Sequence, residues 1–138
     1  MADNSVITVS IVTPDGKVYD HSADMLVVST KAGQLGIMAN HLPVIATLAV
    51  DETRVKYDDK EDSIAVNGGF LEFSNNTATI VADSAECSDD IDVARAESAR
   101  KRAEQRIAEA QQAHDKDSLL RAQVALRRAV NRINTAKK

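Results

Sequence analysis

Four arginines in the last third of the chain have the spacing of a phosphate-binding cluster. Arg95 and Arg102 are seven residues apart, and Arg128 and Arg132 are four apart, so each pair lies on one face of a helix. If the two helices pack antiparallel, the end of the second lies beside the start of the first, and the four guanidinium groups converge. Guanidinium groups bind phosphate oxygens through two parallel hydrogen bonds. A phosphate-binding site and a solvated basic face are the two interpretations of this pattern.

The other chemistry-bearing residues form no catalytic or metal-binding pattern. The sequence has no P-loop motif, no His/Cys spacing typical of a metal site and no supported Ser-His-Asp set, and His21, His41 and His114 are scattered. Cys87 is the only cysteine, which excludes an internal disulfide. No neighbouring Lys, Arg or His lowers the pKa of its thiol, so a small linker residue is favoured over a reactive thiol. The chain is therefore expected not to be an enzyme.

The distribution of glycine and proline divides the chain into two parts. All five glycines and both prolines precede Phe70, and residues 91–138 contain neither. Because these residues mark turns, the long segment without them, rich in Ala, Arg, Glu and Gln, is expected to be helical. We predict a β domain at 1–83, a linker at 84–90 and a helical part at 91–138.

The first part reads as short β-branched runs broken by turn signals. Pro14-Asp15-Gly16 and Asn75-Asn76 are turn sequences, and Gly68-Gly69 is expected to be a third turn. The expected strands cover about 5–13, 18–19, 25–30, 32–38, 44–50, 53–57, 63–67, 70–73 and 77–82. This number of short strands predicts a β-sandwich or flattened barrel. Its core must consist of Val, Ile and Leu, because aromatic residues are only 3% of the chain and Trp is absent.

The second part is expected to form an antiparallel two-helix hairpin. The first helix runs from about Ile91 to Gln112 with Ser88 as its N-cap, and the second is capped by Asp117 or Ser118 and runs to about Thr135. The seam between the helices is expected at Ala96, Ala99, Ala103, Ile107 and Ala110 on the first helix, and Leu119, Ala122, Leu126, Ala129 or Val130, and Ile133 on the second. Alanines bury little apolar area. The hairpin is therefore either a static element or a weakly held switch that undocks.

Charge and hydropathy limit the possible partners. Residues 1–90 carry 5 Lys and Arg against 15 Asp and Glu, a net charge of −10, whereas residues 91–138 carry 12 against 6, a net charge of +6. Two surfaces with different partners are therefore expected. Scarce aromatics weigh against nucleic-acid binding, which needs stacking platforms. No apolar run approaches the ~20 residues that span a bilayer, and the acidic N-terminus lacks a signal-peptide pattern. A cytoplasmic location without direct lipid insertion is expected.

Several blocks of the sequence resemble the epsilon subunits of bacterial F-type ATP synthases. They are Gly33-Gln34-Leu35-Gly36-Ile37 with His41-Leu42-Pro43, then Val66-Asn67-Gly68-Gly69-Phe70-Leu71-Glu72, and then Ile91-Asp92-Val93-Ala94-Arg95-Ala96. The blocks occur in the family's order and cover nearly the whole chain. Ala39-Asn40 departs from the family, where a Pro-Gly pair is usual before the histidine, and this leaves the backbone shape of the loop open.

The resemblance implies a central-stalk subunit of the proton-translocating ATP synthase, although sodium as the pumped ion stays open. Such a subunit is non-catalytic, lies peripherally on the cytoplasmic side of the cell membrane, and couples rotation of gamma and the c-ring to ATP synthesis. Its sandwich binds the gamma subunit and the c-ring. Its hairpin extends toward the alpha and beta subunits and inhibits ATP hydrolysis. The alternative from the residues alone is a free-standing cytoplasmic nucleotide-sensing module.

The resemblance also implies particular site residues. Ile91, Asp92, Arg95 and Ala96 match the ATP-binding motif of the family, in which ATP is a regulatory ligand rather than a cofactor. The complete expected nucleotide set is Glu86, Asp92, Arg95, Arg102, Arg128 and Arg132. The residues expected to contact the c-ring and gamma are Gly36, His41, Leu42 and Pro43. The affinity for ATP and the prevailing state of the hairpin stay open.

Overall fold

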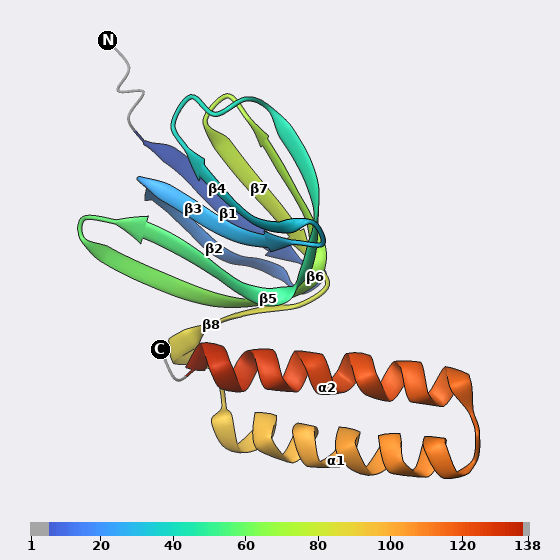
Figure 1. Ribbon diagram of the computed structural model, residues 1–138. Coiled ribbons are helices and arrows are strands. Elements are labelled where there is room, and N and C mark those ends of the chain that lie inside the picture. Colours follow the sequence, from blue (N-terminus) through green and yellow to red (C-terminus); the bar gives the residue numbers. More distant parts are fainter. Residues whose placement is uncertain (1–5, 137–138) are drawn as a thin grey trace.

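The order of the elements separates strands from helices as the sequence predicted (Figure 1). The structure is a computed structural model that describes residues 6–136. Its strands are β1 (Ile7–Thr13), β2 (Gly16–Ala23), β3 (Met25–Thr30), β4 (Gly33–Met38), β5 (Val44–Tyr57), β6 (Lys60–Ser74), β7 (Thr77–Ala82) and β8 (Ala85–Cys87). A 3-10 helix, η1 (Ser88–Asp90), leads into α1 (Val93–Gln112), and α2 (Lys116–Ala136) follows. The predicted fold class, a sandwich followed by a two-helix hairpin, is confirmed.

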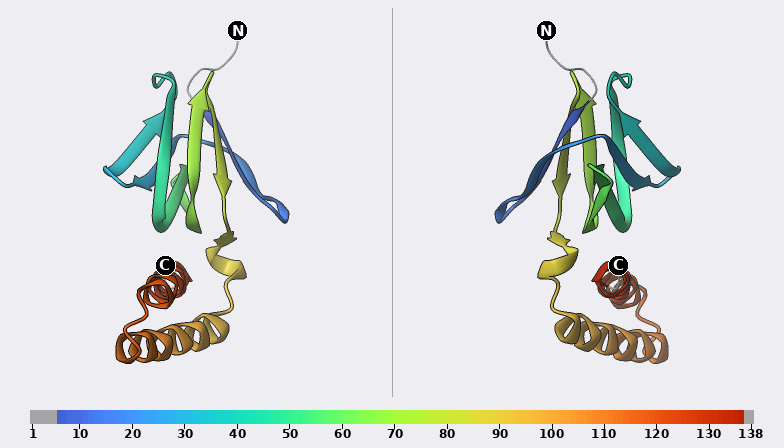
Figure 2. Two further views of the ribbon diagram at one scale, coloured as in Figure 1. Left: turned by 90° about the vertical axis from the view of Figure 1, so that its right-hand side faces the viewer. Right: turned by 90° about the vertical axis from the view of Figure 1, so that its left-hand side faces the viewer.

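The strands form one folded-over sheet that makes the two layers of a sandwich (Figure 2). Their order is β2-β1-β7-β6-β5-β3-β4, and β8 pairs with β6. The β1–β7 pair is parallel and the other pairs are antiparallel. The long strands β5 and β6 pair along most of their length and hold the sheet together.

The core between the layers is mostly aliphatic, as the composition predicted, but it also contains Phe73. In β1, Ile7, Val9 and Ile11 are fully buried and alternate with more exposed neighbours, which is the expected period of two. The largest fully buried side chains are Phe73, Ile7, Ile11, Leu26, Ile37, Ile64, Leu71, Ile80, Val9, Val28, Val55 and Val66.

Two strands, β5 and β6, are longer than expected. The prediction that each would be two shorter strands, 44–50 with 53–57 and 63–67 with 70–73, was wrong. Residues 44–57 form one strand because Asp51, which interrupts the apolar pattern, accepts a hydrogen bond from Ser29 Oγ at 2.8 Å and stays in register opposite Val66. Gly68 and Gly69 have positive φ angles of 89° and 122°, but they bend β6 instead of ending it. A Cβ on Gly69 would collide with the backbone of β7, so this position needs glycine.

The segment 84–90, expected to be a linker, is ordered. It contains β8, which adds to the edge of β6, and η1. The predicted helix caps were wrong: Asp92 rather than Ser88 caps α1, and its carboxylate accepts a hydrogen bond from the Arg95 backbone N–H at 3.1 Å. Asp115 rather than Asp117 or Ser118 plays this part at the start of α2. In both cases the cap is the residue immediately before the first residue of the helix.

The helices pack antiparallel through a seam of small residues. Ala96, Ala103 and Ala110 of α1 are buried, and Ala122, Ala129 and Ile133 are the buried apolar residues of α2. Of the two residues left open by the sequence, Ala129 lies in the seam, whereas Val130 is 36% exposed. Within residues 6–136, neither helix is both long and apolar enough to cross a membrane.

Candidate functional sites

The register of the hairpin brings two of the four predicted arginines, one from each helix, to the same level. Arg106 of α1 and Arg121 of α2 line the same groove between the helices. Both helices rise about 1.5 Å per residue, and eleven residues make about three turns. Arg95 lies eleven residues before Arg106, and Arg132 lies eleven residues after Arg121. Arg95 is therefore level with Arg132 and on the same side of the hairpin.

Two of the expected nucleotide ligands are already bonded to each other. Arg132 Nε lies 2.8 Å from Glu86 Oε1, and the two side chains are 25% and 38% exposed. This charge-assisted hydrogen bond ties the last turns of α2 to β8, since Glu86 belongs to that strand. Asp92 is also engaged, because its carboxylate caps α1 at Arg95.

The remaining three arginines carry charge that no described carboxylate neutralises. Arg95, Arg102 and Arg128 form no ion pair with any carboxylate of residues 6–136. The Nε atom of Arg128 is inaccessible to solvent and has no hydrogen-bond partner in the same part of the chain. Arg100, by contrast, pairs with Glu97 at 2.8 Å on its own helix. This concentration of uncompensated cations suits an anionic ligand.

A buried polar cluster, which the sequence did not predict, joins α2 to the sandwich. Asn131 is 7% exposed, and its Nδ2 donates to Val66 O at 3.3 Å and to Asn67 Oδ1 at 3.1 Å. Thr135 is fully buried and donates to Asn131 Oδ1. Asn67 in turn donates to Ser84 Oγ at 3.0 Å. The only available signal was a polar residue inside the apolar stripe of α2.

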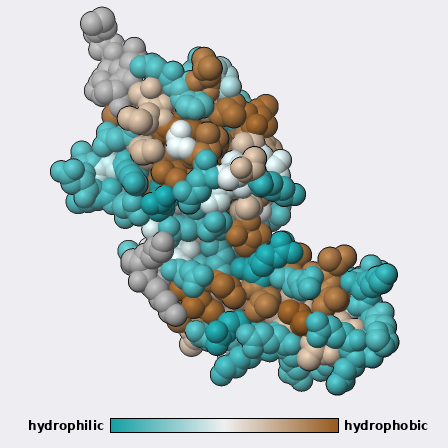
Figure 3. Space-filling view, in the orientation of Figure 1, coloured by the Kyte–Doolittle hydropathy of each residue, from teal (hydrophilic) through white to brown (hydrophobic). Residues whose placement is uncertain are grey.

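An open groove runs beside this cluster, between α2 and the sandwich. A groove of about 960 Å³ lies between the two, lined by Leu126 and Val130 of α2 and by Val50 and Glu52 of β5. Figure 3 shows a largely hydrophilic surface over the hairpin, with hydrophobic residues along its seam. The hydrogen bonds of Asn131 and the Glu86–Arg132 pair are the polar contacts that join the described part of α2 to the sandwich.

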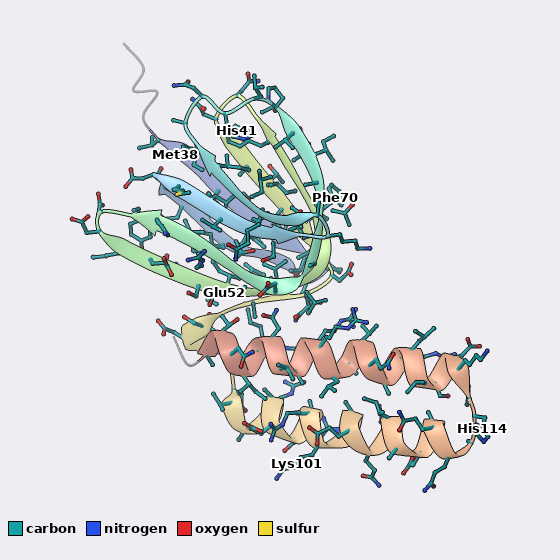
Figure 4. All side chains as sticks on the ribbon, in the orientation of Figure 1. Met38, His41, Glu52, Phe70, Lys101 and His114 are labelled. Carbon is teal, nitrogen blue, oxygen red and sulfur yellow. The ribbon has the colours of Figure 1, made fainter. Side chains whose placement is uncertain are left out.

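The residues expected to bind partners lie at the other end of the sandwich. Figure 4 shows His41 at the end of the sandwich that points away from the hairpin, and His114 at the hairpin turn. Leu42 is 79% exposed, and Pro43 beside it is also exposed. His41 is half-buried instead, with its ring edge-on to Phe73 at 5.9 Å between centroids. Gly36 lies within β4, apart from the loop itself.

The region around Cys87 has perturbed pKa values that favour unreactive neutral groups. Burial, and then the nearby acids Asp90, Asp62 and Asp89, raise the pKa of the Cys87 thiol. Burial, followed by the hydrogen bond to Asp62, raises the pKa of Tyr19 well above its usual range. Tyr19 Oη donates to Asp62 Oδ2 at 2.7 Å, so this cluster joins β2 to the β5–β6 hairpin. Among residues 6–136, no group of His, Cys, Asp and Glu side chains could hold a metal ion.

Comparison with known families defines the class of protein. The family described as "ATP synthase, Delta/Epsilon chain, beta-sandwich domain" matches residues 6–88. Its companion, "ATP synthase, Delta/Epsilon chain, long alpha-helix domain", matches residues 89–137. The chain therefore belongs to the delta/epsilon chain family of ATP synthase.

Within that family the sequence falls with the epsilon chains. It is 70% identical to the ATP synthase epsilon chain of Levilactobacillus brevis and 70% identical to that of Pediococcus pentosaceus, each over 99% of both chains. This confirms the resemblance seen in the sequence blocks. A chain of the mitochondrial ATP synthase of Euglena gracilis, from a cryo-EM structure of OSCP/F1/c-ring in rotational state 1, shares the fold with a TM-score of 0.80. That match has 19% identity and covers 100% of this chain and 85% of the other.

Proposed function

We propose that this chain is a central-stalk subunit of a proton-translocating ATP synthase and couples rotation of gamma and the c-ring to ATP synthesis. Its membership of the family and its relatives named ATP synthase epsilon chain support this place in the complex. Its role is regulatory rather than catalytic. It lies peripherally on the cytoplasmic face of the cell membrane, where protein partners hold it. The net charge of −10 on residues 1–90 would be repelled by an anionic bilayer.

The sandwich binds gamma and the c-ring through the end that carries the 41–43 loop. Support comes from the apolar side chains exposed there: Met38 is 58%, Leu42 79% and Ile45 77% exposed. Exposed large apolar side chains that gather at one place indicate a protein interface. This end points away from the hairpin, so partner binding leaves the hairpin free to move (Figure 4).

The hairpin acts as the regulatory element, and the polar docking of α2 is the observation that carries this proposal. An interface formed by Asn131, Thr135 and the Glu86–Arg132 pair exposes groups that water solvates well when it opens. The alanine seam between the helices adds little apolar burial. In the extended state the hairpin reaches the alpha and beta subunits and inhibits ATP hydrolysis.

ATP stabilises the folded hairpin in this scheme. Its phosphates bridge Arg95 and Arg102 of α1 to Arg128 and Arg132 of α2, and thereby compensate cations that repel one another in the ligand-free form. Glu86 leaves Arg132 when the phosphates bind there, and Asp92 and Glu86 meet the base or ribose, because carboxylates beside phosphates would repel them. A ligand that binds only the folded state stabilises it by about 2.7 kcal/mol at one hundred times its dissociation constant. Low ATP then releases the helices.

Isothermal titration of the full chain with ATP tests the site. Arg95→Ala should weaken binding, whereas Lys101→Ala should not, because Lys101 is exposed on the side of α1 that faces away from α2 (Figure 4). Both variants remove one positive charge from the same helix, so a general charge effect would weaken both equally. Equal affinities of Arg95→Ala and the parent would remove Arg95 from the site. No binding to the parent would leave the arginines as a solvated or partner-facing basic patch.

Co-purification tests the place in the complex. The chain should be recovered with a membrane-bound ATPase, and the assembled enzyme carrying Arg95→Ala should hydrolyse ATP more slowly, since its hairpin favours the extended form. Recovery of the chain only in the free form would favour the alternative of a free-standing nucleotide-sensing module.

A further inference from the structure

The loop at the exposed end of the sandwich is held by a turn far from it in the sequence. The Asn40 backbone N–H donates to Asn76 Oδ1 at 2.7 Å, although the two residues are 36 positions apart. A second contact joins Asn76 Nδ2 to Asn40 Oδ1 at 3.5 Å. Asn40 itself has a φ of 68°, a left-handed conformation that asparagine adopts more readily than most residues.

Asn76 is a rigid anchor for this contact. It lies in the tight β6–β7 turn together with Asn75, and both residues have positive φ angles, of 56° and 52° respectively. Its backbone oxygen accepts a hydrogen bond from the Thr8 N–H of β1 at 2.9 Å. Because the backbone of Asn76 is fixed on one side by the turn and on the other by β1, its side chain holds the loop in a single place.

A second anchor acts on the next residue of the loop. The ring of His41 packs edge-on against Phe73, which is only 1% exposed, and the His41 N–H donates to Met38 O at 3.2 Å. Met38 and Leu42, on either side of the two anchored residues, stay exposed. The contacts therefore fix the backbone and leave the apolar side chains free for a partner.

We propose that Asn76 is a positioning residue for partner binding: its side-chain oxygen holds the 40–43 loop so that Leu42 is presented in the conformation that docks. This inference rests on the proposed binding of gamma and the c-ring at this end. A loop ordered before docking loses less conformational freedom when it binds, so it binds more tightly. Asn76 itself need not touch the partner, because it acts through the backbone of Asn40.

Two glycine variants in the same turn separate this role from the stability of the turn. Asn76→Gly removes the acceptor but keeps a residue that tolerates the positive φ. Asn75→Gly makes the matched change at the exposed neighbouring position and leaves the Asn40–Asn76 contact intact. Asn76→Asp keeps an oxygen acceptor in place. For this variant the measured quantity is the protection of the Asn40 amide from hydrogen exchange.

The assay is rebinding of the full chain to an ATP synthase from which this subunit has been removed. Asn76→Gly should raise Kd by roughly two- to tenfold, the loss expected for one hydrogen bond, and should speed exchange of the Asn40 amide. Asn75→Gly should do neither, and Asn76→Asp should restore the protection. Equal Kd values for Asn76→Gly and Asn75→Gly, or an unprotected Asn40 amide in Asn76→Asp, would overturn the proposal.

A further variant, Leu42→Ala, distinguishes a wrong role for Asn76 from a wrong docking surface. If Leu42→Ala weakens rebinding while Asn76→Gly does not, only the positioning role of Asn76 is overturned. If neither variant changes rebinding, this end of the sandwich is not the docking surface, and the proposed binding of gamma and the c-ring here is overturned together with the role of Asn76. Because Leu42 is 79% exposed, its truncation should leave the stability of the sandwich unchanged.

Discussion

Replacement of Asn131 by alanine should undock the hairpin from the sandwich. The change removes the donor to Val66 O and Asn67 Oδ1, contacts of 3.3 and 3.1 Å inside a buried interface. Each neutral hydrogen bond contributes about 0.5–1.5 kcal/mol net, so the loss is about 1–3 kcal/mol. Since 1.4 kcal/mol corresponds to a factor of ten, the docking equilibrium should fall by roughly 5- to 150-fold.

Hydrogen exchange of the α2 amides in the full chain measures this effect, because undocking lowers their protection relative to the sandwich strands. Asn134→Ala is the matched control: Asn134 lies one turn further along the same helix and is exposed. Both variants gain the same helix propensity from alanine, so their difference isolates the buried contacts. If the α2 amides are equally protected from exchange in both variants, the polar cluster does not hold the hairpin and the reasoning is wrong.

Three further predictions concern stability. Gly69→Ala should lower the midpoint of chemical unfolding more than Gly33→Ala. Both positions have positive φ, so alanine costs roughly 1–3 kcal/mol at each, but a Cβ collides with the backbone only at Gly69. Equal midpoints would show that the strand shifts freely. The hydrogen bonds from Ser118 hold the pKa of Asp115 below its ordinary value, so this contribution is present at neutral pH and is lost as the pH falls below about 4. Circular dichroism should therefore show a weaker acid dependence of helicity in Asp115→Asn, and an unchanged acid profile would contradict the assignment. The fragment 1–90 should be more stable to heat than the fragment 1–83, because only the longer one keeps β8 on the edge of β6; identical melting curves would show that β8 adds nothing to the sandwich.

Local sequence determined the division of this protein into a β domain and a helical hairpin. The glycines and prolines occur only before Phe70, and the alternation in β1 placed Ile7, Val9 and Ile11 on the buried face. Signals of this kind act over a few residues, through backbone freedom and side-chain period, so they are readable without the fold. The same signals misplaced the breaks at Asp51 and Gly68-Gly69, because pairing with neighbouring strands decides whether a strand continues there.

The contacts that hold the two candidate sites were decided by tertiary structure alone. Asn131 meets Asn67, Glu86 meets Arg132, and Asn40 meets Asn76 across separations of 64, 46 and 36 residues. The sequence predicted Glu86 and Arg132 as members of one site through resemblance to a family. The bond between them, however, depends on how β8 lies relative to α2. A polar side chain carries no local mark of its distant partner. Only the packing of the sandwich and the helices brings the two groups within hydrogen-bond distance. Burial then makes an unpaired polar group costly, so the buried groups form hydrogen bonds with each other.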